Sequence, residues 1–514
     1  MNRFSLMVTL LVGGSALCVQ EACAAGFWDP EVRITNMKVV ARDAKTATIQ
    51  FDVSWEGSWR NEVNHDAAWI FFKARKAGGA DPSTPLRAGW QHVRLAADRV
   101  LNPTGYGQKM PPKAQASDGA LPYHLPGRSD DNRPGGVEYS RSFFTRDKAD
   151  APLEFLVPDG KDGFTGVFLQ RAENGAGTAV AHGVTVVWDL TASKGLGDPG
   201  KAQLRAFGHE MVYVDEGSFA LGTGSTETYA FYQYADGDDK TNPYWVKSPG
   251  AIPTGRKPGM LWAPKTDLKD GGEIPASFPN GYSAFYCMKK QVTPRQYAYF
   301  LNVLTPAQVK ARYALPDKMN MSSPIVIPAA KVKALNIPKE GRLPGEAFSF
   351  KKGGGRGAGV GVEPLSWVDG AAYAAWAGLR PMTELEIEKL VRGPREPIPG
   401  EVGPCYWGAV GFPPWQWETI KGADTIVEIA VTVGNAKGRA FKGTHGNGTL
   451  SLPADWPQAD AVGSGTRCVG KRGGALIGLD RARVSDRLTA AVTDPARLYK
   501  FRCVRTAPVT KGKR

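Results

Sequence analysis

The strongest constraint on the fold is a two-residue alternation of apolar and polar side chains near the N-terminus. It is clearest in EVRITNMKVVARDAKTATIQFDVSW, residues 31–55, where β-branched residues are frequent and Asp43-Ala44-Lys45 interrupts the pattern. Further short apolar stretches follow up to residue 190, and Gly, Pro and Asn clusters separate them. This pattern predicts an antiparallel β-sandwich of the immunoglobulin or fibronectin type over residues 26–195. The polar, Pro-rich segment 101–136 is predicted to be a loop.

Helix-start signals appear only in the second half of the chain. At each of four places a Ser or Thr that can cap a helix is followed three residues later by a side chain that can reach back to it. The pairs are Thr293–Gln296, Thr305–Gln308, Ser366–Asp369 and Thr383–Glu386. Glu384 and Glu388 lie two residues before and two residues after Glu386. We interpret all three glutamates as favourable charge at a helix start rather than as catalytic acids.

These two patterns predict an α+β protein of two domains. With 514 residues the chain is long enough to build two cores. The Gly- and Pro-containing stretch around 191–203 predicts a linker, which we place at 196–208. The second domain then spans 209–506, and a basic tail spans 507–514.

The first 25 residues have the organisation of a secretory signal peptide. A short positive region, MNR, precedes a brief apolar run, and EACAAG offers small residues for cleavage near Ala24 or Ala25. No later apolar run approaches the roughly 18 residues of a membrane helix. We therefore expect a periplasmic or secreted protein without a membrane span.

The net charge of +14 raises the question of an acidic partner. Anionic polysaccharide and nucleic acid are the two candidates that such a charge suggests. The basic residues are spread along the chain, however, and the longest block is only the terminal KGKR. This distribution favours the dispersed surface charge of an exported protein, so no nucleic-acid partner is predicted.

Cysteine and histidine spacing argues against a metal centre or a redox pair. Cleavage would remove Cys18 and Cys23, and no CxxC or HxH spacing occurs. The disulfide candidates that remain are Cys287, Cys405, Cys468 and Cys503; they allow three pairings, among which the sequence does not choose. The DGDD stretch 236–239 is interpreted as a turn, with a structural calcium ion as the alternative.

Several motifs in collinear order resemble the formylglycine-generating enzyme family, also called sulfatase-modifying factor domains. They are MVYVDEGSFALGT, AFYCMKKQVTPRQYAYFLN, PLSWVDGAAYAAWAGLRPMTELEIEKLVRGP, the Trp-x-Trp of FPPWQWE, RGGA and the closing FRCV, within residues 209–506. The resemblance implies a C-type-lectin-like fold for the second domain, with much ordered coil and paired terminal strands. It also implies a site in which two thiolates hold copper, because soft thiolates suit Cu(I).

The copper-site positions of this sequence depart from that family pattern. Aligned on Gly473-Gly474, the two thiol positions are Gly478 and Arg483, and the family's serine is Ala475. The family's calcium-site residues are replaced by Phe412-Pro413, and Ala374 stands at a structural cysteine, which leaves Cys503 without the partner that the resemblance implies. The tryptophan of the oxygen pocket is retained as Trp415. We therefore expect neither formylglycine generation nor a copper cofactor, and we name no catalytic residue.

The same region predicts a binding surface. We expect the pocket rim to carry Trp415, Trp417, Ala475, Gly478, Arg481, Arg483 and Arg487. Guanidinium groups beside aromatic rings suit anionic or sugar ligands. The alternative is that these tryptophans fill the core of a coil-rich fold and these arginines hold backbone carbonyls.

Our leading functional expectation is an exported binding or scaffold module at the cell envelope. Its partner would be an anionic glycan or an envelope protein. Two alternatives stay open. One is a periplasmic oxidoreductase-type enzyme with different chemistry on the same fold, suggested by Trp415. The other is lectin-like capture of anionic glycans by the arginine cluster.

Overall fold

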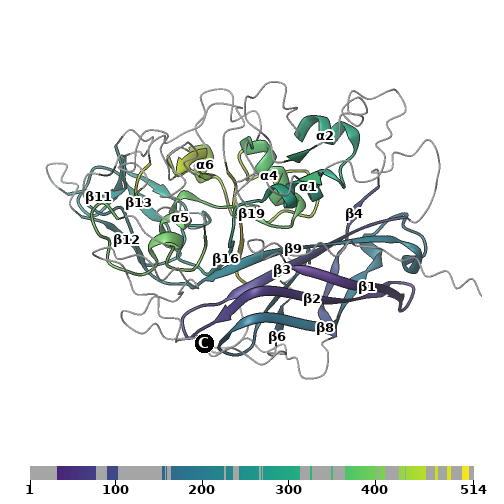
Figure 1. Cartoon of the computed structure of the whole chain (residues 1–514). Coiled ribbons are helices and arrows are strands. Elements are labelled where there is room, and N and C mark those ends of the chain that lie inside the picture. The colour runs from purple at the N-terminus through teal and green to yellow at the C-terminus, as the bar shows by residue number, and fades with distance from the viewer. Residues whose placement is uncertain are drawn as a thin grey trace, which may run out of the picture.

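The protein is described here from a computed structural model, as a β-rich α+β structure with several antiparallel sheets (Figure 1). The described residues are 32–76, 89–101, 153–156, 158, 164–224, 227, 229–235, 242–264, 268, 270–312, 325–326, 349–350, 365–401, 405–410, 428–434, 436–458, 469–472, 483–487 and 500–508. The expected signal peptide, the DGDD stretch, almost all of the expected 101–136 loop and most of the basic tail lie outside them.

A four-stranded antiparallel sheet forms from the alternating N-terminal sequence. Its order is β1 (Arg33–Ala41), β2 (Thr46–Arg60), β8 (Gly175–Asp189) and β5 (Leu95–Leu101). Alternate residues of β2 are buried, among them Ile49, Phe51 and Val53, as the two-residue period predicts. The β1–β2 hairpin turns where the pattern is interrupted, because the Asp43 carboxylate accepts hydrogen bonds from the backbone N–H groups of Lys45 and Thr46.

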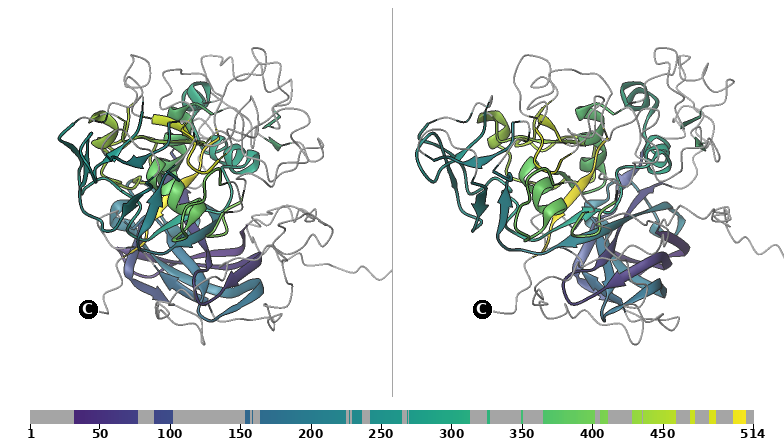
Figure 2. Two further views of the ribbon diagram at one scale, coloured as in Figure 1. Left: turned by 90° about the vertical axis from the view of Figure 1, so that its left-hand side faces the viewer. Right: turned by 60° about the vertical axis from the view of Figure 1, so that its left-hand side comes forward.

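A second, eight-stranded sheet runs through both halves of the chain (Figures 1 and 2). Its order is β19 (Arg380–Pro381), β22 (Cys503–Thr506), β16 (Phe285–Met288), β9 (Gln203–Val214), β3 (Asp66–Arg75), β7 (Val167–Arg171) and β6 (Leu153–Leu156), with β4 (Gln91–His92) beside β3. The central strand β9 pairs with β3 from the N-terminal half and with β16 from the C-terminal half.

This arrangement differs from the linker expected at 196–208. Residues 203–208 are the first half of β9 and pair with β3, so the two halves share backbone hydrogen bonds. Two short 3₁₀ turns, η3 (Leu190–Ala192) and η4 (Pro199–Lys201), occupy the Gly- and Pro-containing part. The physical reason is that QLRAFG alternates apolar and polar residues and continues without a break into HEMVYV.

Strand β3 is buried on both faces, which explains its nearly continuous apolar sequence. Trp69 and Phe71 belong to a core shared with the C-terminal half, whereas Ala68, Ile70 and Phe72 pack into the core between the two large sheets. The eight-stranded sheet is therefore the layer on which both cores are built.

The α-helices of the described residues lie in the C-terminal half, and four of them begin where the predicted caps place them. They are α1 (Pro294–Leu301), α2 (Pro306–Arg312), α4 (Trp367–Trp376), α5 (Glu384–Arg392) and α6 (Ala436–Arg439). Reciprocal capping hydrogen bonds are present at all four predicted pairs. In the part of the chain that the structure describes, no helix is long and apolar enough to cross a membrane.

Short strands complete the C-terminal half. They pair as β10 (Phe219–Leu221) with β12 (Tyr244–Val246); β11 (Tyr232–Gln233) with β14 (Leu261–Trp262); β13 (Ile252–Thr254) with β14 and β15 (Gly272–Ile274); β17 (Ile325–Val326) with β18 (Ser349–Phe350); and β20 (Glu428–Val431) with β21 (Val469–Arg472).

Candidate functional site

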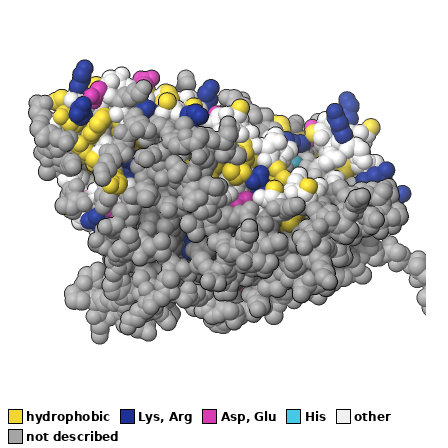
Figure 3. All heavy atoms as spheres, turned by 90° about the horizontal axis from the view of Figure 1, so that it is seen from above, with side chains coloured by type: hydrophobic (Ala, Val, Ile, Leu, Met, Phe, Trp, Pro, Cys, Tyr) yellow, Lys and Arg dark blue, Asp and Glu magenta, His cyan; other side chains and the backbone are white. Residues whose placement is uncertain are grey.

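The pocket rim expected from the sequence is only partly described. Trp415, Trp417, Ala475, Gly478 and Arg481 lie outside the described residues. Arg483 and Arg487 lie inside them, and both make ion pairs within the protein. On the face seen in Figure 3, the described Lys and Arg side chains are dispersed rather than gathered in one patch.

Arg487 is a buried structural residue. Its side chain is fully buried, and its Nε and Nη2 atoms donate to the two carboxylate oxygens of Glu384 over 2.8 and 3.0 Å. Its guanidinium also lies over the ring of Phe231, 3.9 Å from the centroid, and donates to the carbonyl of Tyr229. This position differs from the expected rim and matches the alternative in which arginines tie the fold together.

Arg483 has a similar role nearer the surface. Its Nε and Nη2 atoms each lie 3.1 Å from an oxygen of Asp486, and its backbone N–H donates to the same carboxylate. The carboxylate is buried, and the guanidinium side chain keeps 18% of its surface exposed. An internal ion pair thus stands at position 483, where the resemblance would imply a metal ligand.

Each glutamate at the start of α5 holds a buried arginine, which the sequence analysis did not foresee. The pairs are Glu384–Arg487 at 2.8 Å, Glu386–Arg380 at 2.6 Å and Glu388–Arg392 at 3.2 Å. The predicted helix-start role also holds, since Glu386 accepts the backbone N–H of Thr383. The helix start thus doubles as the centre of a charged network that ties α5 to distant segments.

The described cysteines are buried free thiols: Cys287, Cys405 and Cys503. No disulfide joins these three, and Cys468 lies outside the described residues. Burial raises the pKa of Cys405 to about 11 and holds the pKa values of Cys287 and Cys503 well above the ordinary thiol value. Since metal binding and nucleophilic attack need the thiolate, this environment is unsuited to both.

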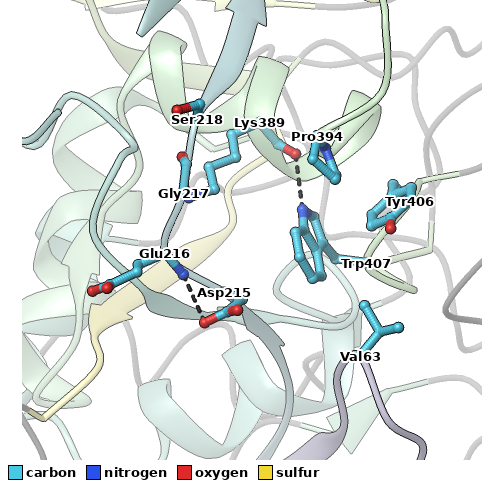
Figure 4. A pocket seen from close by; sticks show the side chains of 9 residues that line it. All are labelled: Val63, Asp215, Glu216, Gly217, Ser218, Lys389, Pro394, Tyr406 and Trp407. Carbon is cyan, nitrogen blue, oxygen red and sulfur yellow. Dashed lines mark hydrogen bonds between the residues drawn. The ribbon is translucent and has the colours of Figure 1, made fainter. Parts of the chain in front are cut away.

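A pocket of about 100 Å³ opens where the two halves of the chain meet (Figure 4). One wall is the turn 215–218 between β9 and β10, where Gly217 has a φ of 146°, a conformation that favours glycine. Trp407, Tyr406 and Pro394 stand on the opposite side. Val63, from the β2–β3 hairpin, closes the lower edge.

Two hydrogen bonds hold Trp407 in the pocket wall, and two more from Lys389 hold neighbouring backbone. The Trp407 indole Nε1 donates to the carbonyl of Lys389 in α5 over 3.0 Å, and the Asn64 side-chain amide donates to the Trp407 carbonyl over 3.0 Å. The ammonium of Lys389 donates to the carbonyl of Gly217 and, over 2.9 Å, to that of Tyr282. The wall is therefore preorganised by both halves of the chain.

The opposite wall is acidic. The carboxylate of Asp215 accepts the backbone N–H of Glu216 over 2.9 Å and the hydroxyl of Tyr213 over 3.3 Å. The side chain of Glu216 is exposed to solvent. Burial and the Asp215 charge raise the pKa of Tyr213, which keeps its phenol protonated as the donor. Figure 4 shows the Glu216 side chain directed away from Trp407.

A second polar cluster is hydrogen-bonded internally. The side-chain oxygen of Gln170 meets the His65 Nε2 atom at 3.0 Å and the Tyr286 hydroxyl at 2.7 Å, and its amide donates to Glu154. Burial holds the pKa of His65 well below its usual value and raises the pKa of Glu154 to about 7. These shifts follow from burial within the sheet.

The sequence analysis found parts of this pocket but did not assemble them. Asp215, Glu216 and Gly217 lie within the MVYVDEGSFALGT motif, which was noted only for its resemblance, and Trp407 was not singled out. Nothing in the local pattern places Val63 and Asn64 beside Trp407, since more than 340 residues separate them. That contact exists because β3 and β16 pair with opposite edges of β9.

No family model matches this chain, and no curated protein matches it significantly. Within the described ranges, no group of three or more His, Cys, Asp or Glu side chains is arranged to hold a metal ion.

Proposed function

We propose that this protein is an exported relative of formylglycine-generating enzymes that does not itself generate formylglycine and acts as a binding or scaffold module at the cell envelope. The proposal includes an immunoglobulin- or fibronectin-like sandwich followed by a C-type-lectin-like domain. In its support, β22 near the C-terminus pairs with β16 and β19, in keeping with the paired terminal strands that the resemblance implies.

The observation that carries the proposal is the ion pair between Arg483 and Asp486. A generating enzyme of this family needs two thiolates at neighbouring positions, and here one of those positions holds a guanidinium paired with Asp486. A guanidinium is permanently charged and donates hydrogen bonds only, so it cannot bind or reduce a soft cation. The other position, Gly478, has no side chain at all.

The described cysteines offer no replacement for this pair. Cys287 and Cys405 lie together in a buried cluster with Val504 and Leu390, and the Cys405 thiol donates to the carbonyl of Leu390 over 2.8 Å. Their raised pKa values favour the neutral thiol. These residues fit a packing role and leave binding as the function best supported.

The alternative of anionic-glycan capture by arginines has less support. Arg487 and Arg502 are fully buried on carboxylates, and Arg505 is buried with its guanidinium against the Gly378 carbonyl, so none of them faces a ligand. The oxidoreductase alternative rests on Trp415, which lies outside the described residues. The pocket between the 215–218 turn and Trp407 is the better-supported binding site.

The test is co-expression with a sulfatase-type substrate peptide, followed by mass spectrometry of the peptide. We expect the peptide cysteine to keep its thiol mass, whereas a generating enzyme expressed in parallel converts it. A loss of mass equal to replacement of the thiol by an aldehyde would overturn the proposal. Fractionation of the expressing cells tests the export component, for which we expect the mature protein outside the cytoplasm.

A further inference from the structure

Three buried ionisable side chains come together from neighbouring strands of the eight-stranded sheet (Figure 1). They are Asp66 at the start of β3, Glu210 in β9 and Lys289, which directly follows β16. We propose that Lys289 and Glu210 condense within the folded protein to form a side-chain amide, an isopeptide bond between Nζ and Cδ. This inference goes beyond the proposed function and does not depend on it.

Strand register places the three side chains on one face of the sheet. The backbone N–H of Lys289 donates to the Glu210 carbonyl over 2.8 Å, which extends the antiparallel pairing of β16 with β9. Glu210 pairs with Ala68, and Asp66 lies two residues before Ala68 on the same face of β3. Asp66 and Glu210 are therefore diagonal neighbours, a separation that long side chains can span.

The amine of Lys289 is in direct contact with the Glu210 carboxylate. Nζ donates to Oε1, and the two side chains are only 7% and 6% exposed. The other oxygen, Oε2, is buried and accepts no hydrogen bond from the described residues. Because burial disfavours the charged forms, it favours transfer of a proton from the nitrogen to the carboxylate. That transfer leaves an amine with a free electron pair beside an uncharged carboxyl carbon.

Asp66 supplies an acid beside this pair. Its fully buried carboxyl accepts hydrogen bonds from the Trp55 indole over 2.8 Å and from the Ser58 hydroxyl and the Trp59 backbone N–H, each over 2.9 Å. Burial raises the pKa of Asp66 to about 6; the charge of the neighbouring lysine opposes this shift, and that of the neighbouring glutamate adds to it. The carboxyl therefore gains and loses a proton near neutral pH.

The condensation balances without any other reactant. The Nζ electron pair attacks Cδ of Glu210, the new C–N bond forms, and the bond from Cδ to Oε2 breaks. Of the three hydrogens on the Lys289 ammonium, one stays on the amide nitrogen and two leave with the oxygen as water. Asp66 gives a proton to the departing oxygen and regains one from the nitrogen. The ammonium and carboxylate together carry no net charge, and neither do the amide and water.

Proximity and exclusion of water favour the reaction inside the sheet. Groups held in reacting geometry behave as if present at effective concentrations of about 10⁵–10⁸ M. Ala68 and Val212, which share this face, are fully buried, so bulk water is kept from the pair. The amide also replaces two desolvated charges by one neutral group. It would join β9 covalently to β16 across a separation of 79 residues.

Peptide mapping of the full chain tests the inference directly. The purified protein is denatured, digested with trypsin and analysed by mass spectrometry. We expect residues 206–240 and 270–290 in one branched species, whose mass is the sum of the two peptides less one water molecule. Residue 290 ends the second segment because trypsin does not cleave after an acylated lysine. Recovery of the two segments only as separate peptides from the wild-type protein would overturn the inference.

Two substitutions assign the reacting groups. Lys289→Arg keeps the positive charge but replaces the amine by a guanidinium that stays protonated, so we expect no branched species. A branched species joined at Glu210 in this variant would overturn the assignment of Lys289. Asp66→Asn keeps both reacting groups and should slow amide formation after refolding by about 10²–10⁴-fold, the usual contribution of a general acid. An unchanged rate in Asp66→Asn would overturn the role of Asp66.

An exposed ion pair in the same protein serves as the internal control. Lys201 and Asp198 lie 3.8 Å apart, and both side chains are more than half exposed. Because water solvates both charges, we expect no dehydrated form of the peptide that contains them. Loss of water there to the same extent would show that the product arises during sample handling and would overturn the inference.

Discussion

At the scale of single residues, the charged side chains near the end of the chain hold the fold together. The sequence analysis saw a run of arginines, but sequence proximity does not tell whether a guanidinium faces solvent or a buried carboxylate. Arg380, Arg392, Arg487 and Arg502 are buried against Glu386, Glu388, Glu384 and Glu428, respectively. Such pairs specify which segments meet, and removal of one partner leaves an uncompensated buried charge.

We predict that Arg487→Met lowers the free energy of unfolding by about 3–5 kcal/mol, the cost typical of breaking a buried ion pair. Urea denaturation of the full chain measures this loss. Arg33→Met is the matched control, because Arg33 is half exposed and lies 4.0 Å from Glu56, so its loss should cost less than about 1 kcal/mol. Equal effects of the two substitutions would contradict the structural role of Arg487.

Buried histidines give the protein a pH dependence that can be assigned to one residue. His209 is buried beside the hydroxyl of Tyr373, 3.2 Å away, and burial lowers its pKa to about 3. The folded state therefore favours neutral imidazole. This contribution is complete above the unfolded pKa of about 6.5 and is lost as the pH falls from 6.5 towards 3.

We predict that His209→Gln removes a stability slope of about 1.4 kcal/mol per pH unit below pH 6.5. The measurement compares the free energies of unfolding of variant and wild type at pH 7.5 and pH 5. Asp66, whose pKa burial raises to about 6, contributes in the opposite direction, but it contributes equally to both proteins and cancels in the difference. A difference that does not change with pH would contradict the assignment.

At the scale of elements, local sequence was a reliable guide to where helices begin. The capping residues bond to backbone groups three positions away, so the signal and its structural consequence lie within one turn. Thr383 adds a tertiary contact, since its hydroxyl also donates to the carbonyl of Pro279 over 3.0 Å. The start of α5, which carries the three paired glutamates, is fixed in this way.

We predict that Thr383→Ala destabilises the protein by about 1–2 kcal/mol, because it removes the cap of a buried helix. Thr305→Ala removes the equivalent cap of α2, where Thr305 is half exposed, and should cost about 0.5–1 kcal/mol. Thermal and urea unfolding compare the two variants. If Thr305→Ala lowered the free energy of unfolding more than Thr383→Ala, burial of the capping residue would not determine how much the cap stabilises the protein.

At the scale of the whole molecule, strand β9 joins the N-terminal and C-terminal halves of the chain in one sheet. Ten residues of β3 pair with Gln203–Val212, and β16 pairs with the end of the same strand. A boundary drawn at residue 195 would expose this whole edge of β3, and a boundary at 208 would expose its first four residues, 66–69. The two cores therefore depend on one another through the shared sheet.

We predict that the fragment 26–195 does not fold by itself, because it lacks the strand that covers β3. A fragment extended to residue 214 retains this strand and should regain β-structure, although its outer edge is then unpaired. Circular dichroism and the dispersion of amide signals in NMR spectra compare the two fragments. A well-dispersed spectrum for 26–195 would show that the sandwich is independent of β9.

The sequence by itself determined the strands that alternate, the turn at Asp43 and the four helix starts, because each depends on side chains within a few residues of one another. Only the tertiary structure decided that β9 joins the halves, that Arg487 is buried on Glu384, and that Asn64 and Val63 reach Trp407 to build a pocket. Those contacts depend on pairing between strands far apart in the chain, where sheet register and burial outweigh any local preference.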